Sequence, residues 1–381
     1  MTDAAKWLEG RLAEMEGALS ALVNVNSFTE NVAGGNRVAD LLAEVFTLEG
    51  LSVERVKSEK YADHLVFRSG GKAGAKPVGL IGHLDTVFPP GVFEGYRVDG
   101  DLRRGPGVLD MKGGLVVVAW ALKALAQTKG LAALPPLRVI IVSDEEVGSF
   151  EGAPLIRTEL KGAQAALVFE SGRANDAIVT SRKGTGNLDV TAKGKAAHAG
   201  NNHADGANAA WALAKFIDKA QGLTDYQRGV TVNVGKIGGG QGKNTVPDHA
   251  VAELDLRFVT AVDAEWLVKS LFDAAAESAA AVPGTHLHCV GGANRLPMER
   301  TEANVKLFEA YAKHAVQFGL AASESPRVGG GSDACTTSAM GVASIDALGP
   351  RGKGFHTKDE YIEAKTLIPR AQALAGLLAS L

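Results

Sequence analysis

Apolar residues recur at helical spacing near the start of the chain. Two sets, in which neighbours lie mostly three or four residues apart, predict one continuous opening helix and a second helix after it. The sets are Leu8, Leu12, Met15, Leu19 and Leu22, and Val38, Leu41, Leu42, Val45 and Phe46.

Short apolar runs with the character of strands follow these helices. They are residues 64–68, 78–83, 137–143 and 165–169. Helices predicted near 113–128 and 153–161 separate the later runs. Strands that alternate with helices indicate an α/β fold, in which a mixed or parallel sheet is covered on both faces.

The order of elements changes near Arg182. The next stretch reads as strand, helix, strand, strand, helix and strand, at residues 187–193, 206–220, 230–237, 249–258, 264–280 and 285–290. This β-α-β-β-α-β order is typical of a ferredoxin-like domain. After it, the alternation of helices and strands seen before Arg182 resumes, with a helix near 303–318, a strand near 343–347 and a helix near 364–380.

An inserted domain is the simplest explanation of this change. We expect an α/β domain formed by residues 1–182 and 293–381, with a ferredoxin-like domain inserted at 183–292. The length of 381 residues agrees with this division, since at about 150 residues per domain it suggests two or three domains.

The composition excludes several classes of protein. Lys and Arg number 40 and Asp and Glu 43, so a net charge of -3 gives no basic excess for nucleic acid. A hydrophobic fraction of 46% with 22% charged residues is normal for a globular chain with a sizeable core. No stretch reaches the roughly 18 uncharged apolar residues of a membrane span. We therefore expect neither nucleic-acid nor membrane partners.

The number of cysteines and the N-terminal sequence indicate in which cellular compartment the protein is expected. Cys289 and Cys335 are the two cysteines, and they offer no disulfide framework. The charged N-terminus does not have the apolar core of a secretory signal. We expect a cytoplasmic protein, although a secreted chain whose signal had been removed would have the same features.

Five short segments concentrate ionisable residues at predicted strand ends and turns. They are residues 82–86 (GHLDT), 107–114 (GVLDMKGG), 143–149 (SDEEVGS), 169–172 (FESG) and 354–356 (GFH). The first four each end or follow an apolar run, so we expect them to gather at one rim of the sheet. Imidazole and carboxylate groups together suit Zn²⁺, and the ligand types leave Mn²⁺ and Co²⁺ as alternatives.

Each segment taken alone has an ordinary explanation. A histidine before a turn is more often a satisfied polar residue than a metal ligand, and adjacent acidic residues after a strand usually cap a helix. The combination favours a metal site, because carboxylates collected at one rim repel one another unless cations neutralise them. No Gly-x-Ser-x-Gly motif occurs, which argues against a serine hydrolase.

The motifs resemble, in order along the chain, those of a family of zinc-dependent exopeptidases and deacylases. That family includes glutamate carboxypeptidase (carboxypeptidase G), aminoacylase, succinyl-diaminopimelate desuccinylase and acetylornithine deacetylase. The resemblance extends from His83 to His356 and is closest to glutamate carboxypeptidase. Beyond the segments above it includes AAHAG at 196–200, NTVP at 244–247 and GGGSDA at 329–334.

The resemblance implies two zinc ions per subunit. Asp110 would be the carboxylate that bridges them. His83 and Glu170 would complete one site, and Glu146 and His356 would complete the other. Three carboxylates would offset most of the four positive charges of the ion pair.

The resemblance also assigns roles next to the metal ligands. Glu145 would be the general base that takes a proton from water and passes it to the leaving amine. Asp85 would accept a hydrogen bond from the His83 ring and so fix its tautomer and orientation. The peptide between Asp110 and Met111 would be cis, as it is in the family.

A second group of implied residues lies in the inserted domain and near the glycine loop. His198 would reach the active site of a neighbouring subunit and stabilise the oxyanion, which implies a homodimer joined through these domains. Asn244 and Arg257 would hold polar groups of the substrate, Arg257 by clamping a free carboxylate. Gly330 and Gly331 would offer backbone N–H groups to a carboxylate. From the residues alone, a surface-loop histidine is the favoured interpretation of His198, and a strand-face salt bridge explains Arg257 as well as a substrate clamp does.

The resulting hypothesis is a di-zinc amidohydrolase that acts on a peptide or small molecule with a free carboxylate. It would release a C-terminal amino acid, glutamate, from peptide, N-acyl or pteroyl conjugates, with the inserted domain as lid and dimerisation domain. One alternative is an N-acyl amino acid deacylase or a dipeptidase with the same metals. An alternative of another class is a catalytically silent protein that binds a small ligand.

Overall fold

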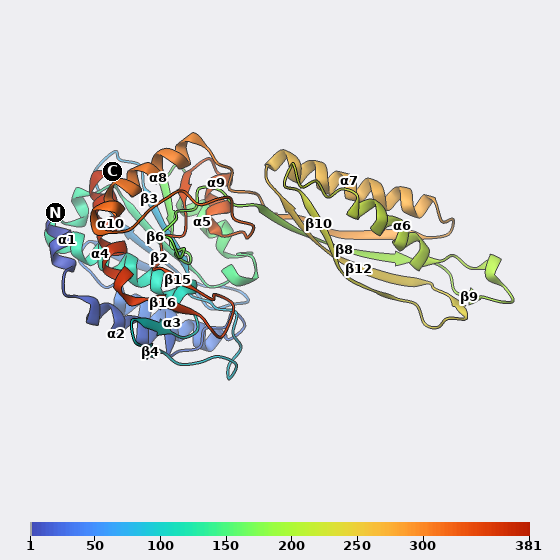
Figure 1. Cartoon of the computed structure of the whole chain (residues 1–381), viewed down its shortest axis with the longest axis horizontal. Coiled ribbons are helices and arrows are strands. Elements are labelled where there is room, and N and C mark those ends of the chain that lie inside the picture. The colour runs from blue at the N-terminus through green and yellow to red at the C-terminus, as the bar shows by residue number, and fades with distance from the viewer. Residues whose placement is uncertain (1) are drawn as a thin grey trace. The chain divides into compact units, whose positions relative to one another are not determined.

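The computed structural model describes residues 2–381 and divides the chain into two compact units (Figure 1). The inserted domain comprises Arg182–Glu299 and Val328–Gly331, and the main domain comprises the other described residues. The chain passes between the two domains near residues 182, 300, 328 and 332.

A six-stranded sheet forms the centre of the main domain. In spatial order its strands are β1 (Leu51–Val56), β2 (His64–Ser69), β6 (Leu137–Val142), β3 (Val78–His83), β7 (Ala165–Val168) and β14 (Ala343–Ile345). β6, β3, β7 and β14 run parallel to one another. β2 is antiparallel to both of its neighbours, β6 and β1. This is the mixed sheet of an α/β fold, as predicted.

Helices cover both faces of this sheet (Figure 1). Successive residues of a strand point to opposite faces. A side chain at Gly79 of β3 would meet Leu160, which follows α5 (Gly152–Glu159). One at Gly82 would meet Leu115 of α4 (Gly113–Thr128). α4 and α5 therefore lie on opposite faces, and β3 is buried along its whole length.

The remaining helices of the main domain surround this core. They are α1 (Asp3–Leu8), α2 (Leu12–Val23), α3 (Val32–Val45), α8 (Glu302–Ala315), α9 (Asp333–Ala339) and α10 (Leu367–Ser380). The predicted single opening helix is in fact α1 and α2. Gly10, with a φ of 77°, separates them in a left-handed conformation that no right-handed helix can include. Among residues 2–381, no helix has the length and apolar character needed to cross a membrane.

A small second sheet in the main domain was not predicted. Its antiparallel strands are, in spatial order, β15 (Gly352–Lys353), β16 (Tyr361–Glu363), β5 (Leu102–Arg104) and β4 (Arg97–Asp99). The strands have two or three residues each, too few to leave a hydrophobic pattern. Residues 354–360 form the loop from β15 to β16 and carry His356.

The inserted domain has a four-stranded antiparallel sheet with two helices. In spatial order the strands are β10 (Thr231–Gly239), β12 (His249–Phe258), β8 (Gly184–Lys193) and β13 (His286–Arg295). The helices are α6 (Ala209–Gln221) and α7 (Ala261–Ala280), and in chain order the elements follow the predicted β-α-β-β-α-β pattern. Buried and exposed residues alternate along β8 and β12 because the helices cover one face of the sheet.

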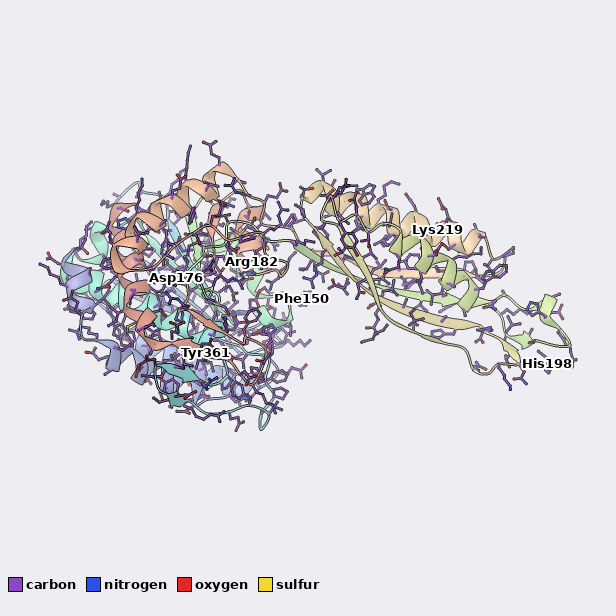
Figure 2. The ribbon with its side chains drawn as sticks, in the orientation of Figure 1. Phe150, Asp176, Arg182, His198, Lys219 and Tyr361 are labelled. Carbon is purple, nitrogen blue, oxygen red and sulfur yellow. The ribbon has the colours of Figure 1, made fainter. Side chains whose placement is uncertain are left out.

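A two-stranded ribbon extends from this sheet. Its strands are β9 (Ala197–His198) and β11 (Thr245–Val246). β9 lies just beyond the end of β8, and β11 lies just before the start of β12. The ribbon therefore lies at the end of the inserted domain where β8 finishes (Figure 2).

Candidate metal centre

Three of the predicted site segments follow neighbouring parallel strands. His83 is the last residue of β3, Glu145 and Glu146 come after β6, and Glu170 comes after β7. Because β6, β3 and β7 are adjacent and parallel, these residues share one edge of the sheet. His83 and Glu170 are buried there.

The segment that carries Asp110 reaches the same edge by another route. It lies between β5 and α4, so it does not follow a strand of the main sheet as expected. Its backbone is irregular: Gly107 has a φ of 77°, and the peptide between Asp110 and Met111 is cis. A Cβ on Gly114, at the start of α4, would lie 2.1 Å from the carbonyl oxygen of Phe169. The glycine therefore lets this segment approach the end of β7.

Asp110 lies between two histidine rings. Its Oδ1 lies 3.5 Å from Nε2 of His83, and its Oδ2 lies 3.4 Å from Nε2 of His356. Nε2 of His356 also lies 3.1 Å from Glu146 Oε2, and Nε2 of His83 lies 3.8 Å from Glu170 Oε2. The five residues thus form two histidine–carboxylate pairs with one shared carboxylate.

Two buried atoms in this cluster test whether the residues fit metal ions. Among residues 2–381, Nε2 of His83 and Oδ1 of Asp110 are buried side-chain atoms without a hydrogen-bond partner. Buried polar atoms are rarely left unsatisfied unless a functional ligand engages them. Imidazole nitrogen and carboxylate oxygen are the donors that zinc and related divalent ions take. The donor set therefore fits two divalent cations.

The carboxylates and histidines perturb one another strongly. Burial, together with the charge of Asp110, raises the pKa of Glu146 to about 7 and that of Glu170 well above its usual range. Hydrogen bonding to Asp110 and Glu146 raises the pKa of His356 to about 10. Without cations the cluster therefore retains protons that metal ions would displace.

Asp85 organises the neighbouring chain segments. Nδ1 of His83 lies 3.0 Å from the backbone carbonyl oxygen of Asp85 and 3.4 Å from its carboxylate. The ring therefore has the carbonyl as its nearer acceptor, whereas the sequence had suggested the carboxylate. The carboxylate accepts hydrogen bonds from the backbone N–H groups of Glu145 and Glu146 and from the hydroxyl of Thr29.

Glu145 belongs to the same cluster. Ligand atoms of His83, Glu145 and Glu170 all lie within 4.8 Å of one another. Glu145 is partly exposed, whereas His83 and Glu170 are buried. A partly exposed carboxylate beside a buried donor set can exchange protons with a substrate or water.

Two residues with a clear role in the site were missed from the sequence. Thr29, from the loop before α3, donates to Asp85, and no motif marks it. Glu360 accepts hydrogen bonds from the backbone N–H groups of Gly107, Leu109 and Asp110. Its acidic side chain four residues after His356 was a signal, but the sequence gave no reason to expect it to be buried.

The predicted residues of the inserted domain do not lie together. His198 is in the ribbon, where it pairs with Thr245 beside Asn244. Arg257 is opposite Thr185, at the beginning of β8, whereas His198 comes after the end of that strand. The length of β12 between these ends is about 27 Å at 3.4 Å per residue.

Arg257 and the glycine loop have partners within the inserted domain. Nε and Nη2 of Arg257 each donate to an oxygen of Asp255 at 2.8 Å, which is the salt-bridge alternative from the sequence. Nη1 of Arg182 donates to the carbonyl oxygen of Gly330 at 3.1 Å and to that of Gly331 at 3.5 Å. These contacts of the loop involve its carbonyl oxygens and not the N–H groups expected to hold a carboxylate.

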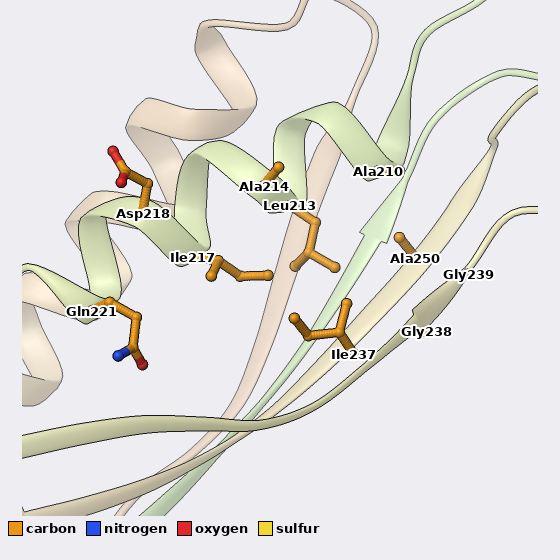
Figure 3. Close-up of a pocket in the computed structure, with 10 residues that line it drawn as sticks. All are labelled: Ala210, Leu213, Ala214, Ile217, Asp218, Gln221, Ile237, Gly238, Gly239 and Ala250. Atoms are coloured by element: carbon orange, nitrogen blue, oxygen red, sulfur yellow. The ribbon is translucent and has the colours of Figure 1, made fainter.

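An apolar groove lies elsewhere on the inserted domain, between α6 and the edge strand β10 (Figure 3). Its volume is about 630 Å³. Leu213 and Ile217 of α6 face Ile237 of β10 across it (Figure 3). None of the predicted site residues lines this groove.

The chain is similar in sequence and fold to several known proteins. The chain is 29% identical to carboxypeptidase G2 of Pseudomonas sp. (strain RS-16) over 366 residues, 94% of this chain and 87% of that relative. It is 28% identical to the acetylornithine deacetylase of Myxococcus xanthus over 267 residues, 65% of this chain and 66% of that relative. The solved structure of aminopeptidase PepT from Bacillus cereus ATCC 10987 has the same fold, with a TM-score of 0.81, 22% identity, and coverage of 97% of this chain and 98% of that one. The sequence matches peptidase family M20/M25/M40 over residues 79–380, and the chain therefore belongs to this family of metallopeptidases and amidohydrolases.

Proposed function

We propose that this chain is a di-zinc amidohydrolase of the carboxypeptidase type. The observation that carries the proposal is the position of Asp110, whose two oxygens face two different histidine rings at 3.5 and 3.4 Å. One carboxylate shared by two histidine–carboxylate pairs is suited to a pair of cations. A bound pair of zinc ions would acidify a water molecule and polarise the scissile carbonyl.

Glu145 is the proposed general base. It would take a proton from the attacking water and deliver it to the nitrogen of the leaving amine. The backbone N–H of Glu145 donates to the buried carboxylate of Asp85 at 3.3 Å, which helps to hold this residue beside the metal ligands. Asp85 is therefore a positioning residue for both the base and the His83 ring.

The replacement Glu145→Gln tests this assignment. A carboxamide cannot accept the proton, so we expect kcat to fall by about 10²–10⁴-fold while the zinc content is unchanged. Glu44→Gln, at an exposed position of α3, is the control and should behave as wild type. If wild type and Glu145→Gln were equally inactive on every amide tested, a silent binding protein would be the better explanation.

The proposed substrate is a peptide, N-acyl or pteroyl conjugate that ends in glutamate. The similarity to carboxypeptidase G2 supports this proposal. The pairing of Arg257 with Asp255 does not separate this substrate from those of the alternative, a deacylase or dipeptidase, because all of them carry a free carboxylate that Arg257 could bind. Rates on acyl-glutamate, acyl-ornithine, succinyl-diaminopimelate and dipeptide substrates would decide between them, and a lack of preference for C-terminal glutamate would exclude the first.

A homodimer joined through the inserted domains is part of the proposal. β10 is an edge strand; its residue Ile237 is 64% exposed, and Trp211 of α6 is 55% exposed. An open strand edge and an apolar groove are suited to pairing with a second copy. His198 and Arg257 lie at opposite ends of one inserted domain, and antiparallel pairing of two copies would place one end beside the other.

His198 is the proposed oxyanion donor in such a dimer. Its Nδ1 accepts hydrogen bonds from the backbone N–H groups of Gly200 and Asn201, both at 3.1 Å. A neutral ring with Nδ1 as acceptor carries its proton on Nε2. The exposed Nε2–H is then available to stabilise charge on a substrate oxygen.

Complementation between two inactive variants tests a role in trans. His198→Ala and Glu145→Gln would each be nearly inactive alone. Coexpressed, they would form mixed dimers in which one of the two sites has both groups, giving about a quarter of the wild-type activity for random pairing. If His198 acted within its own chain, no activity would return, and a monomer in light scattering would exclude the dimer.

Zinc and a cytoplasmic location complete the proposal. Histidine and carboxylate donors favour zinc, with Mn²⁺ and Co²⁺ as alternatives. Two cysteines in the whole sequence give no disulfide framework, which suits a reducing compartment. Elemental analysis of the protein purified from its own cells would identify the metal, and two zinc ions per chain are expected.

A further inference from the structure

Glu360 is a buried carboxylate next to the backbone of Asp110 in the candidate metal centre. It is 1% exposed and lies directly before β16. Its Oε1 accepts from the N–H groups of Leu109 at 2.8 Å and Asp110 at 3.0 Å, and its Oε2 accepts from that of Gly107 at 3.1 Å. One side chain thus satisfies three backbone donors of the segment that carries Asp110.

These donors have no ordinary helical partners. They lie in the irregular segment before α4, where Asp110 has a φ of -118° and a ψ of 89°, outside the helical region. Backbone N–H groups that are buried without an acceptor are costly, so the segment depends on an acceptor from elsewhere. Glu360 supplies it from the other end of the sequence.

The position of Glu360 in the chain links it to the second histidine. His356 lies four residues earlier, in the loop between β15 and β16. That loop is held by a turn in which Thr357 donates to the carbonyl oxygen of Gly354 through both its N–H and its hydroxyl. Glu360 therefore fastens the end of the loop that bears His356 to the backbone of Asp110.

Lys112 anchors the same segment from the other side. Its Nζ donates to the carbonyl oxygens of Leu22 and Val25, at the end of α2, both at 3.1 Å. The segment of Asp110 is thus tied to the end of α2 by the buried side chain of Lys112, and to the loop of His356 by that of Glu360.

We propose that Glu360 is a positioning residue that fixes Asp110 relative to His356 and so sets the affinity of the cation site formed by Asp110, Glu146 and His356. The inference rests on the metal pair of the proposed function but not on its substrate. The other cation site is less dependent on Glu360, because His83 and Glu170 come from the ends of β3 and β7 in the main sheet.

The replacement Glu360→Gln tests the inference. It keeps the size of the side chain but replaces one acceptor oxygen with an NH₂ group that faces a backbone donor. We expect the affinity of one of the two cation sites to fall by about 10–100-fold, the usual effect of removing a partner of a ligand, while the other site is retained. Cobalt titration of the metal-free protein, followed by visible absorption, measures the two steps without any substrate.

Two further variants make the test specific. Glu363→Gln, in the same stretch of sequence, removes a carboxylate that pairs with Arg351, and it should leave both cobalt steps unchanged. Glu360→Asp keeps the carboxyl group with a shorter reach, so it should weaken the same single step to a smaller degree.

The inference has defined contrary outcomes. Equal loss of both cobalt steps, or two unchanged steps in Glu360→Gln, would overturn it. If Glu360→Gln did not fold, Glu360→Asp would decide by the same criterion. A wild type that binds two cobalt ions but cleaves no amide would contradict the proposed function and leave this test intact.

Discussion

The hydroxyl of Thr29 donates a hydrogen bond to Oδ2 of Asp85 at 2.9 Å, and both residues are buried. The backbone N–H of Thr29 also donates to the carbonyl oxygen of Thr86 at 3.2 Å. The loop before α3 is thereby attached to the chain just beyond β3, next to His83. Because the Asp85 carboxylate also holds the N–H groups of Glu145 and Glu146, this loop supports the site without touching the metal ligands.

Replacement of Thr29 by valine removes the donor while keeping the shape of the side chain. Loss of one buried hydrogen bond partner should lower the free energy of unfolding by about 1–3 kcal/mol. Looser support of Asp85 should lower kcat by about 10-fold. Urea unfolding and steady-state kinetics measure the two effects. Thr47→Val is the control, since the exposed hydroxyl of Thr47, just after α3, donates to the carbonyl oxygen of Ala43 in that helix, and equal kcat values for the two variants would contradict the prediction.

Gly114 should tolerate no side chain, because an added Cβ would lie 2.1 Å from the carbonyl oxygen of Phe169. Gly114→Ala must push α4 away from the end of β7, at a cost of about 1–3 kcal/mol in unfolding free energy. Zinc affinity should fall as well, since Asp110 and Glu170 lie beside the two shifted backbones. Gly17→Ala is the matched control. Its Cβ would meet nothing within 4 Å in α2, so this variant should gain about 0.5–1 kcal/mol.

Asp63 should contribute to the acid sensitivity of the main domain. Burial by itself raises the pKa of Asp63, but hydrogen bonds and attraction from Lys57 and Arg55 lower it below its ordinary value of 3.8. The folded state therefore binds this proton more weakly than the unfolded state does. The stabilisation is present above an unfolded pKa of about 3.8 and is lost as the pH falls through the lower folded pKa.

The variant Asp63→Asn gives the measurement for this prediction. It should be less stable than wild type at neutral pH, and the difference should shrink once the pH falls below about 3.8. Urea unfolding across this range measures it. A difference that stayed constant down to about pH 3 would show that the ion pairs of Asp63 are not responsible.

Much of the fold could be predicted because its main strands are long enough to leave a pattern. Apart from Arg138 and His83, β3 and β6 are apolar since they are buried on both faces, and β8 and β12 alternate since one face is exposed. The strands of the small sheet, such as β15, have two or three residues and leave no period. The break between α1 and α2 depends on the backbone of one residue, Gly10, and glycine within a helical pattern is not a decisive signal.

Part of the candidate metal cluster was accessible from the sequence because residues such as His83 and Glu170 follow strands that end at one edge of the sheet. The places of Asp110 and His356 in it were expected only from the family resemblance. Thr29 and Glu360 were not accessible, because their roles depend on contacts between distant segments that no local pattern records. A salt bridge of Arg257 on its strand was foreseen only as an alternative and without its partner Asp255, since an arginine on a strand can bind either a neighbouring carboxylate or a substrate.

Metal binding should release protons at neutral pH. In the cluster without cations the pKa of His356 is raised to about 10 by Asp110 and Glu146, so its ring carries a proton at pH 7. Burial raises the pKa of Glu146 to about 7, so this carboxyl is partly protonated as well. A ligand must be deprotonated to bind a cation, so zinc affinity should rise as the pH increases from about 6 to 8.

Calorimetric zinc titration of the chelator-treated protein in buffers of different ionisation enthalpy measures this release directly. The apparent enthalpy should vary with the buffer, and the slope gives the number of protons released. His356→Ala removes a ligand that carries a proton at neutral pH before the metal binds, so its slope should be smaller than that of wild type. His249→Ala, which replaces an exposed histidine of β12 in the inserted domain, should leave the slope unchanged. An apparent enthalpy independent of the buffer in the wild type would show that the site is already deprotonated before the metal arrives.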